Sequence, residues 1–123
     1  MIKCFFEDNN QGTLRHVVID ALVIKDNKIL LIKRAKHLTG GNKYALPGGF
    51  LDRNETTKEG ILREFNEETG LSGEIISLFR IIDNPGRIGE NRQNVSFVYL
   101  INPLKKISDF DKNEVINIFW FDL

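Results

Sequence analysis

The sequence predicts an α+β domain, in which several strands, one helix and then further strands follow one another along the chain. Runs rich in β-branched residues occupy residues 16–25, 28–33 and 94–101. Between them, residues 56–70 carry the capping signals of a helix at both ends. This order differs from the regular alternation of strands and helices that indicates a parallel sheet.

The length and the composition of the chain are those of one ordinary globular domain. The 123 residues are expected to form a single domain over residues 1–123, with 41% apolar and 28% charged side chains. The formal net charge is zero, so we expect neither nucleic acid nor a membrane as a partner. No apolar run approaches a membrane span, and residues 1–10 lack a signal-peptide pattern, which predicts a cytoplasmic location.

The first segments are predicted to be strands. Residues 2–7 form a short strand, and the sequence Asp-Asn-Asn-Gln-Gly at residues 8–12 is typical of a turn. Residues 16–25 and 28–33 flank a two-residue turn, which indicates a β-hairpin. The nearly continuous apolar run at residues 17–24 indicates a strand covered on both faces.

A helix of about four turns is predicted to begin after Thr56 and to end at Gly70. Thr56 and Glu59 have the spacing of a capping box, and Gly70 occupies the position of a terminating glycine. Gly60 lies inside this helix, where glycine costs about 1 kcal/mol relative to alanine. We therefore expect the helix to pass close to another backbone at Gly60.

One face of this helix is acidic. Glu64, Glu67 and Glu68 converge because side chains three and four residues apart share a face. Like charges at this spacing destabilise a helix by roughly 0.2–0.5 kcal/mol per pair, and Arg63 offsets only part of that cost. Two explanations remain open: a solvated surface face, or a site for a hard divalent cation such as Mg²⁺, which prefers oxygen ligands.

The spacing of residues 49–71 favours the cation site. Every fixed position of the signature G-x5-E-x7-R-E-U-x-E-E-x-G-U, where U is bulky and apolar, is filled here by Gly49, Glu55 and the run Arg63-Glu64-Phe65-x-Glu67-Glu68-x-Gly70-Leu71. This segment resembles the Nudix box, and the chain resembles a Nudix hydrolase. The resemblance implies the Nudix fold, a mixed β-sheet sandwiched between helices. It also implies hydrolysis of a nucleoside diphosphate linked to another group.

The resemblance also implies roles for individual residues of the box. Glu64 and Glu68 would be the main ligands of Mg²⁺, for which Mn²⁺ could substitute. Glu67 would be a third metal ligand or the catalytic base. The backbone carbonyl of Gly49 would complete the metal shell, and Arg63 would orient a glutamate rather than touch the substrate.

The segment before the box carries one further candidate. Residues 34–43 form a polar, basic loop in which Arg34 is a candidate for binding a substrate phosphate, although ordinary surface exposure explains its basic residues as well. The loop leads into Pro47, Gly48 and Gly49. The two glycines would let the backbone approach a ligand closely and take positive φ.

Residues 73–83 and 94–101 are predicted strands, and residues 84–93 between them form a loop. Its Arg87 and Arg92 are suited to bidentate phosphate binding. The loop resembles, with different spacing, a Pro-x-Arg pattern of Nudix enzymes that cleave ADP-ribose; a flexible charged turn explains it equally well. Glu90 is the first candidate for a general base outside the box, and Glu114 is the second.

Residues 105–113 are predicted to form a loop or a single helical turn, and residues 114–121 a strand that carries Trp120. Most Nudix domains continue from this strand into a helix that covers one face of the sheet. This chain stops at Leu123, so the helix is truncated or a partner supplies the cover. Together with the dimers common in the family, this favours a homodimer.

The expected function is Mg²⁺-dependent cleavage of a small nucleotide, with ADP-ribose as the leading substrate. One alternative is a nucleoside triphosphate, including an oxidised nucleotide. Another is a non-catalytic module that senses a nucleotide, although the complete set of box glutamates counts against it.

Overall fold

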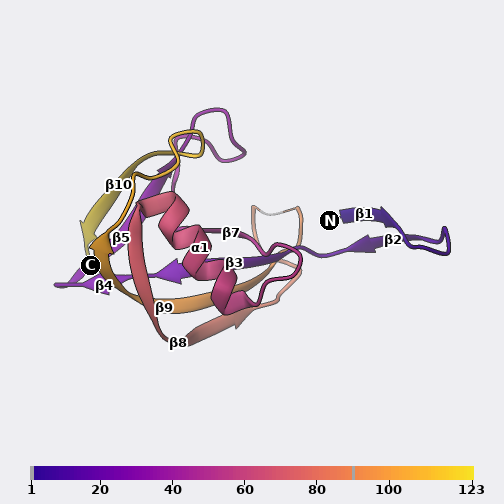
Figure 1. Ribbon diagram of the computed structural model, residues 1–123. Helices are drawn as coiled ribbons and strands as arrows, with labels where there is room; N and C mark the ends of the chain where they lie inside the picture. The colour runs from indigo at the N-terminus through magenta and orange to yellow at the C-terminus, as the bar shows by residue number, and fades with distance from the viewer. Residues whose placement is uncertain (1, 90) are drawn as a thin grey trace.

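The computed structural model describes residues 2–89 and 91–123, which form one helix and ten strands within those ranges. The helix is α1 (Thr57–Thr69). The strands are β1 (Ile2–Phe5), β2 (Gln11–Leu14), β3 (Val17–Leu22), β4 (Ile24–Lys25), β5 (Lys28–Arg34), β6 (Tyr44–Ala45), β7 (Gly48–Phe50), β8 (Leu71–Ile82), β9 (Val95–Lys106) and β10 (Val115–Asp122). The body consists of two four-stranded sheets with α1 beside them (Figure 1).

The first sheet has the strand order β7-β3-β9-β8, and β3 lies at its centre. β3 runs parallel to β9 and antiparallel to β7. Its side chains alternate between the two faces, so Ile19 and Ala21 are fully buried in the core that also contains Phe65 of α1. Val18 and Asp20 face the other side and are only half-buried. The prediction of a strand covered on both faces is therefore right for one face only.

The predicted helix and both of its caps are confirmed. The Thr56 side chain accepts a hydrogen bond from the Glu59 backbone N–H at 3.1 Å, and the Glu59 side chain accepts one from the Thr56 N–H at 3.4 Å. Gly70 ends the helix with φ of 75°. A Cβ at Gly60 would lie 2.5 Å from Cδ1 of Ile19. The expected close approach therefore exists, but it is to a side chain rather than to a backbone.

The predicted hairpin between residues 16–25 and 28–33 forms only at its tip. β4 pairs with β5 through two residue pairs, around a turn in which Asp26 and Asn27 have φ of 52° and 61°. β3 belongs to the other sheet, where it pairs with β9 and β7. The fully buried Val23 separates β3 from β4, so the chain passes from one sheet to the other at that residue.

One later strand, β9, is longer than predicted. β9 continues through Pro103 to Lys106, although the predicted strand ended at residue 101 and residues 105–113 were expected to form a loop or a single helical turn. β3 pairs with β9 only as far as Leu100, so the missing N–H of Pro103 removes no hydrogen bond to β3. β10 pairs with β5 and carries Trp120, as predicted.

The second sheet has the order β10-β5-β4, and β6 also pairs with β5. Within the described residues α1 is the only α-helix, so the mixed sheet predicted to lie between helices has helical cover from α1 alone. The α+β class is confirmed. No helix among these residues is both long and apolar enough to cross a membrane.

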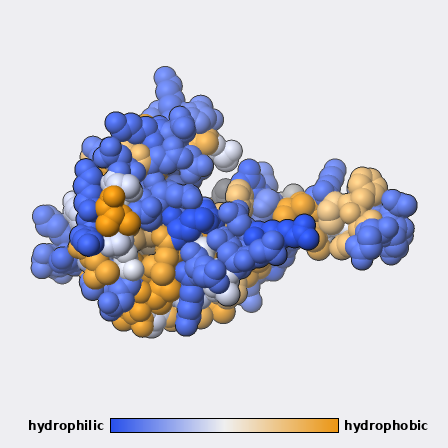
Figure 2. Space-filling view, viewed as in Figure 1, coloured by the Kyte–Doolittle hydropathy of each residue, from blue (hydrophilic) through white to orange (hydrophobic). Residues whose placement is uncertain are grey.

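The β1–β2 hairpin projects away from the body (Figure 1). The predicted strand at residues 2–7 is confirmed as β1 and ends at Phe5. Apolar side chains gather on this hairpin (Figure 2), among them Phe5, which is 74% exposed.

Candidate metal and substrate site

Three carboxylates from two distant segments meet beside α1. Glu64 and Glu68 lie one turn apart on α1, and Glu114 directly precedes β10. One carboxylate oxygen from each residue lies within 4.8 Å of the others. Glu64 and Glu68 are buried and Glu114 is exposed. This group, called the acid cluster below, offers the oxygen ligands that a hard divalent cation prefers.

Backbone hydrogen bonds hold Glu114 in the acid cluster. The Asp111 N–H donates to the carbonyl of Glu67 at 2.7 Å, which ties the loop before β10 to the end of α1. The Ala35 N–H donates to the Glu114 carbonyl at 2.8 Å, which ties the same loop to the end of β5. Glu114 was predicted only as the second candidate for a general base, and no spacing in the sequence links it to the box.

Two glycines of β7 allow this arrangement. The Gly48 N–H donates to Oε1 of Glu68 at 2.7 Å. A Cβ at Gly49 would lie 2.6 Å from the carboxylate of Glu64, so a side chain there would occupy the space of that carboxylate. The backbone thus closely approaches two carboxylates of the acid cluster, and its approach to a ligand stays a prediction. Neither glycine has positive φ, however, so that part of the prediction is wrong.

The electrostatics of the acid cluster disfavour negative charge when no cation is bound. Burial raises the pKa of Glu68 to about 8, against the opposing effect of the Gly48 hydrogen bond. Burial also raises the pKa of Glu64, against the opposing effect of Arg63. A divalent cation would reverse this preference, because it stabilises the ionised form of both carboxylates.

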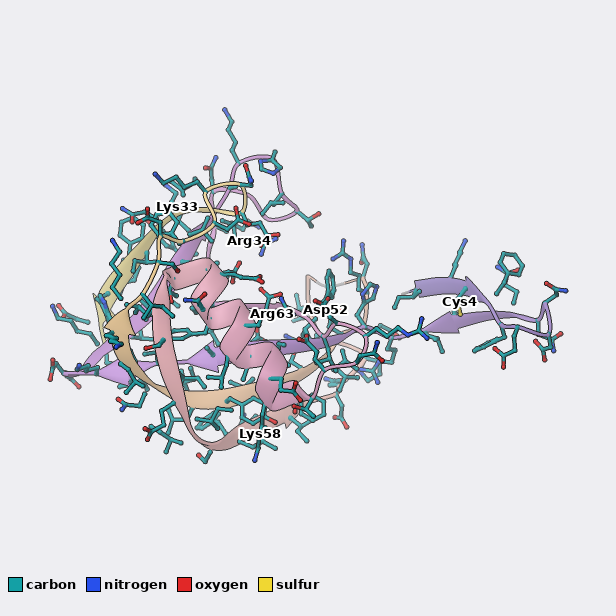
Figure 3. All side chains as sticks on the ribbon, in the orientation of Figure 1. Cys4, Lys33, Arg34, Asp52, Lys58 and Arg63 are labelled. Atoms are coloured by element: carbon teal, nitrogen blue, oxygen red, sulfur yellow. The ribbon has the colours of Figure 1, made fainter. Side chains whose placement is uncertain are left out.

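Arg63 connects the box loop to the helix. Its guanidinium donates to Glu55 at 2.7 Å, to Glu64 at 2.9 Å and to Glu67 at 3.3 Å. It also lies 3.3 Å from the carboxylate of Asp52, toward which it projects in Figure 3. The hydrogen bond from Arg63 holds the pKa of Glu55 at about 2, and the same bond raises the pKa of Arg63. Arg63 is thus placed to orient Glu64.

One predicted residue of the box, Glu67, is not part of the acid cluster. The Glu67 side chain is 46% exposed, and Arg63 is its partner. Its role as a ligand or base stays a prediction. Glu90 lies outside the described residues, so its role as a base stays a prediction as well.

A cleft of about 650 Å³ lies beside the glycines of β7. The three arginines predicted to bind substrate, Arg34, Arg87 and Arg92, all line it, although Arg34 ends β5 and the other two come from the loop between β8 and β9. Phe50 also lines the cleft. The structure therefore gathers these cationic groups around one cavity, next to the carboxylates of α1.

Each arginine has a partner that positions it. Nε of Arg34 donates to the carbonyl of Thr39 at 3.0 Å, and Nη1 of Arg87 donates to Oγ of Ser96 at 2.9 Å. The guanidinium of Arg92 lies 5.5 Å from the centre of the Phe50 ring. Fixed guanidinium groups lose less entropy when they bind a phosphate than free ones do.

Asp20 is a cleft residue that sequence reasoning missed. It lines the cleft beside Arg87, and burial raises its pKa to about 6 while the charge of Arg87 acts in the opposite direction. The available signal was an acidic residue inside an apolar run, at residues 17–24. That run was interpreted as buried on both faces, which left no place for a carboxylate facing a cavity.

Comparison with known sequences places the chain in a family. Residues 14–123 match the model of the NUDIX domain. An ADP-ribose pyrophosphatase from Methanocaldococcus jannaschii is 46% identical over 71 residues, which cover 58% of this chain and 41% of that protein. An 8-oxo-dGTP diphosphatase from Escherichia coli is 32% identical over 59 residues, which cover 48% of this chain and 46% of that protein. The match thus spans less than half the length of these curated relatives.

Solved structures show the same fold. A MutT NUDIX hydrolase from Burkholderia pseudomallei has a TM-score of 0.74 and 28% identity, with 88% of this chain and 85% of that chain covered. A bifunctional NMN adenylyltransferase/ADP ribose pyrophosphatase from Francisella tularensis, complexed with AMP and a manganese ion, has a TM-score of 0.71 and 29% identity. That match covers 91% of this chain and 35% of the other. Because the family model spans nearly all of the chain and the fold agrees, the chain belongs to the NUDIX domain family.

Proposed function

We propose that this chain is a metal-dependent pyrophosphohydrolase that cleaves the diphosphate of a nucleoside diphosphate linked to another group, with ADP-ribose as its leading substrate. The observation that carries the proposal is the acid cluster next to a cleft lined by Arg34, Arg87 and Arg92. Carboxylates that hold a cation and guanidinium groups that hold phosphate are the two requirements of this chemistry.

The residues present fit a divalent cation. Glu64, Glu68 and Glu114 would hold it; the missing side chain of Gly49 leaves the space that the Glu64 carboxylate occupies, and the Gly48 N–H donates to Glu68. A bound Mg²⁺ or Mn²⁺ would neutralise charge on the diphosphate and increase the acidity of a bound water. The relative from Francisella tularensis with a manganese ion supports this choice of metal.

The protein's own groups would orient the reaction. Arg63 and the Gly48 N–H hold the carboxylates of Glu64 and Glu68 in place. A water molecule would attack one phosphorus atom, the bridging P–O bond would break, and two monophosphates would leave. Glu114 and Glu67 are the described candidates for accepting the proton of that water.

The substrate is inferred from the relatives and the cleft. The ADP-ribose pyrophosphatase shows both higher identity and a longer match than the 8-oxo-dGTP diphosphatase. The cleft of about 650 Å³ is lined by Gly48 and Gly49 but not by the carboxylates of the acid cluster, which leaves room for a group attached to a diphosphate at that cluster. An oxidised nucleoside triphosphate is the second candidate, supported by the E. coli relative.

The test is hydrolysis of ADP-ribose, NADH, dinucleoside polyphosphates and 8-oxo-dGTP with and without Mg²⁺. We expect AMP and ribose 5-phosphate from ADP-ribose, in the presence of the metal only. Glu68→Gln should lower kcat by about two orders of magnitude or more, because it removes a charged ligand of the cation. Glu74→Gln is the matched control, since Glu74 is exposed on β8.

Near-normal turnover by Glu68→Gln, or turnover that needs no metal, would contradict the proposal. Tight binding of ADP-ribose without turnover in either Mg²⁺ or Mn²⁺ would instead support the nucleotide-sensing alternative.

A further inference from the structure

Among the described residues that line the cleft, Asp20 is the acidic one, and the proposed chemistry does not use it. It lies on β3, where the neighbouring Ile19 and Ala21 point into the core under α1. Because side chains alternate along a strand, Asp20 points to the opposite face, where it lines the cleft. It is therefore separated by the sheet from the carboxylates of α1.

Gly48 is the residue that lies between Asp20 and the acid cluster. Asp20 pairs with Gly48 across the β3–β7 ladder, and a Cβ at Gly48 would lie 2.6 Å from Oδ1 of Asp20. The N–H of the same Gly48 donates to Glu68 at 2.7 Å. Because β7 is the edge strand of this sheet, a substrate whose diphosphate lies at the acid cluster would pass that edge and bring the group next to the diphosphate, rather than the diphosphate itself, to Asp20.

The surroundings of Asp20 leave it able to accept hydrogen bonds. Arg87 is the charged group that acts on its carboxylate, and the Nη1 group of Arg87 donates to Oγ of Ser96 at 2.9 Å. Within residues 2–89 and 91–123, none of the side-chain hydrogen bonds ends on the Asp20 carboxylate. The half-buried carboxylate faces the cleft, where a donor group on a ligand can reach it.

We propose that Asp20 determines specificity by accepting a hydrogen bond from a ribosyl hydroxyl group of the substrate. This inference rests on the proposed function and deepens it. An ionised carboxylate offers only acceptors, a hydroxyl group supplies a donor, and a phosphate at neutral pH supplies almost none and is repelled. Asp20 therefore favours a diphosphate linked to a sugar over a nucleotide that would place a further phosphate beside it.

The test compares Asp20→Asn with the wild-type protein, above the Asp20 pKa of about 6. The amide keeps the shape of the side chain but loses the charge and one acceptor oxygen. We expect kcat/KM for ADP-ribose to fall about tenfold or more, with the change in KM rather than in kcat. Asp26→Asn is the matched control, because Asp26 lies on the β4–β5 turn and asparagine tolerates its φ of 52°.

Two substrate analogues identify the hydroxyl group, because ADP-ribose contains two ribosyl groups. The first is ADP-ribose whose adenosine ribose lacks the 2′ and 3′ hydroxyls, and the second is ADP esterified with a propyl group in place of the terminal ribose. The penalty of Asp20→Asn should disappear for the analogue that lacks the partner hydroxyl, which would assign the contact to that ribose.

An equal penalty with all three substrates would show that Asp20 acts through the structure alone and would overturn the inference, as would no penalty with ADP-ribose. If Asp20→Asn does not fold, as judged by circular dichroism, Asp20→Ser replaces it in the same comparison. The proposed function is tested separately, because its failure would appear as absent ADP-ribose hydrolysis by the wild-type protein.

Discussion

Glu68→Gln should stabilise the metal-free protein at neutral pH, although it lowers kcat with the metal by about two orders of magnitude or more. Glu68 is only 3% exposed, and burial raises its pKa from 4.5 to about 8. The folded protein therefore keeps a proton on Glu68 at pH values where the unfolded chain has released it. The contribution of Glu68 to the free energy of unfolding is fully present below pH 4.5 and is lost as the pH rises to about 8.

The size of the effect follows from the pKa difference. Each pH unit inside that interval changes the free energy of unfolding by about 1.4 kcal/mol, so the loss from about pH 5 to about pH 7 is roughly 2–3 kcal/mol. The raised pKa values of Glu64 and of Asp20 act in the same direction. The free energy of unfolding of the wild type therefore falls with pH more steeply than Glu68 alone would cause. The difference in this slope between wild type and variant gives the contribution of Glu68.

The assay is urea unfolding of both proteins at these two pH values with a chelator present. We expect Glu68→Gln to be more stable than the wild type near neutral pH by roughly 2–3 kcal/mol, and similar to it near pH 5. Mg²⁺ should then stabilise the wild type far more than the variant. Glu74→Gln should keep the wild-type slope.

Identical pH slopes for wild type and Glu68→Gln would refute this reasoning, because they would mean that Glu68 ionises normally in the folded protein.

Two further predictions concern the residues that position the acid cluster. Gly48→Ala should lower the free energy of unfolding by about 2–4 kcal/mol, because its Cβ would overlap the carbonyl oxygen of Ile19; urea unfolding measures this. Gly86→Ala is the control, since its Cβ would have a neighbour only at 3.4 Å, and comparable losses in the two variants would count against the steric argument. Arg63→Lys should raise the Mg²⁺ concentration needed for half-maximal activity by roughly 10- to 100-fold, because lysine lacks the planar set of donors that reaches Glu55, Glu64 and Glu67. A titration of activity against Mg²⁺ tests this, and an unchanged midpoint would exclude an orienting role.

The local features of this protein could be predicted because they depend on contacts between near neighbours in the chain. The capping box of Thr56 and Glu59 and the end of the helix at Gly70 require only residues a few positions apart. The grouping of Glu64 and Glu68 on one helix face follows from helical geometry in the same way. The box and its helix were therefore determined by the sequence itself.

Other features depend on which strands pair and in which register. β3 leaves its expected partner β5 and pairs with β9, and this turns Asp20 toward the cleft. The loop before β10 is held against the end of α1, and this brings Glu114 to the carboxylates of the helix. The spacing of residues that are close in the sequence does not indicate such contacts, because their energy comes from packing between segments distant in the chain. Only the tertiary structure decided the third member of the acid cluster and the acidic residue of the cleft.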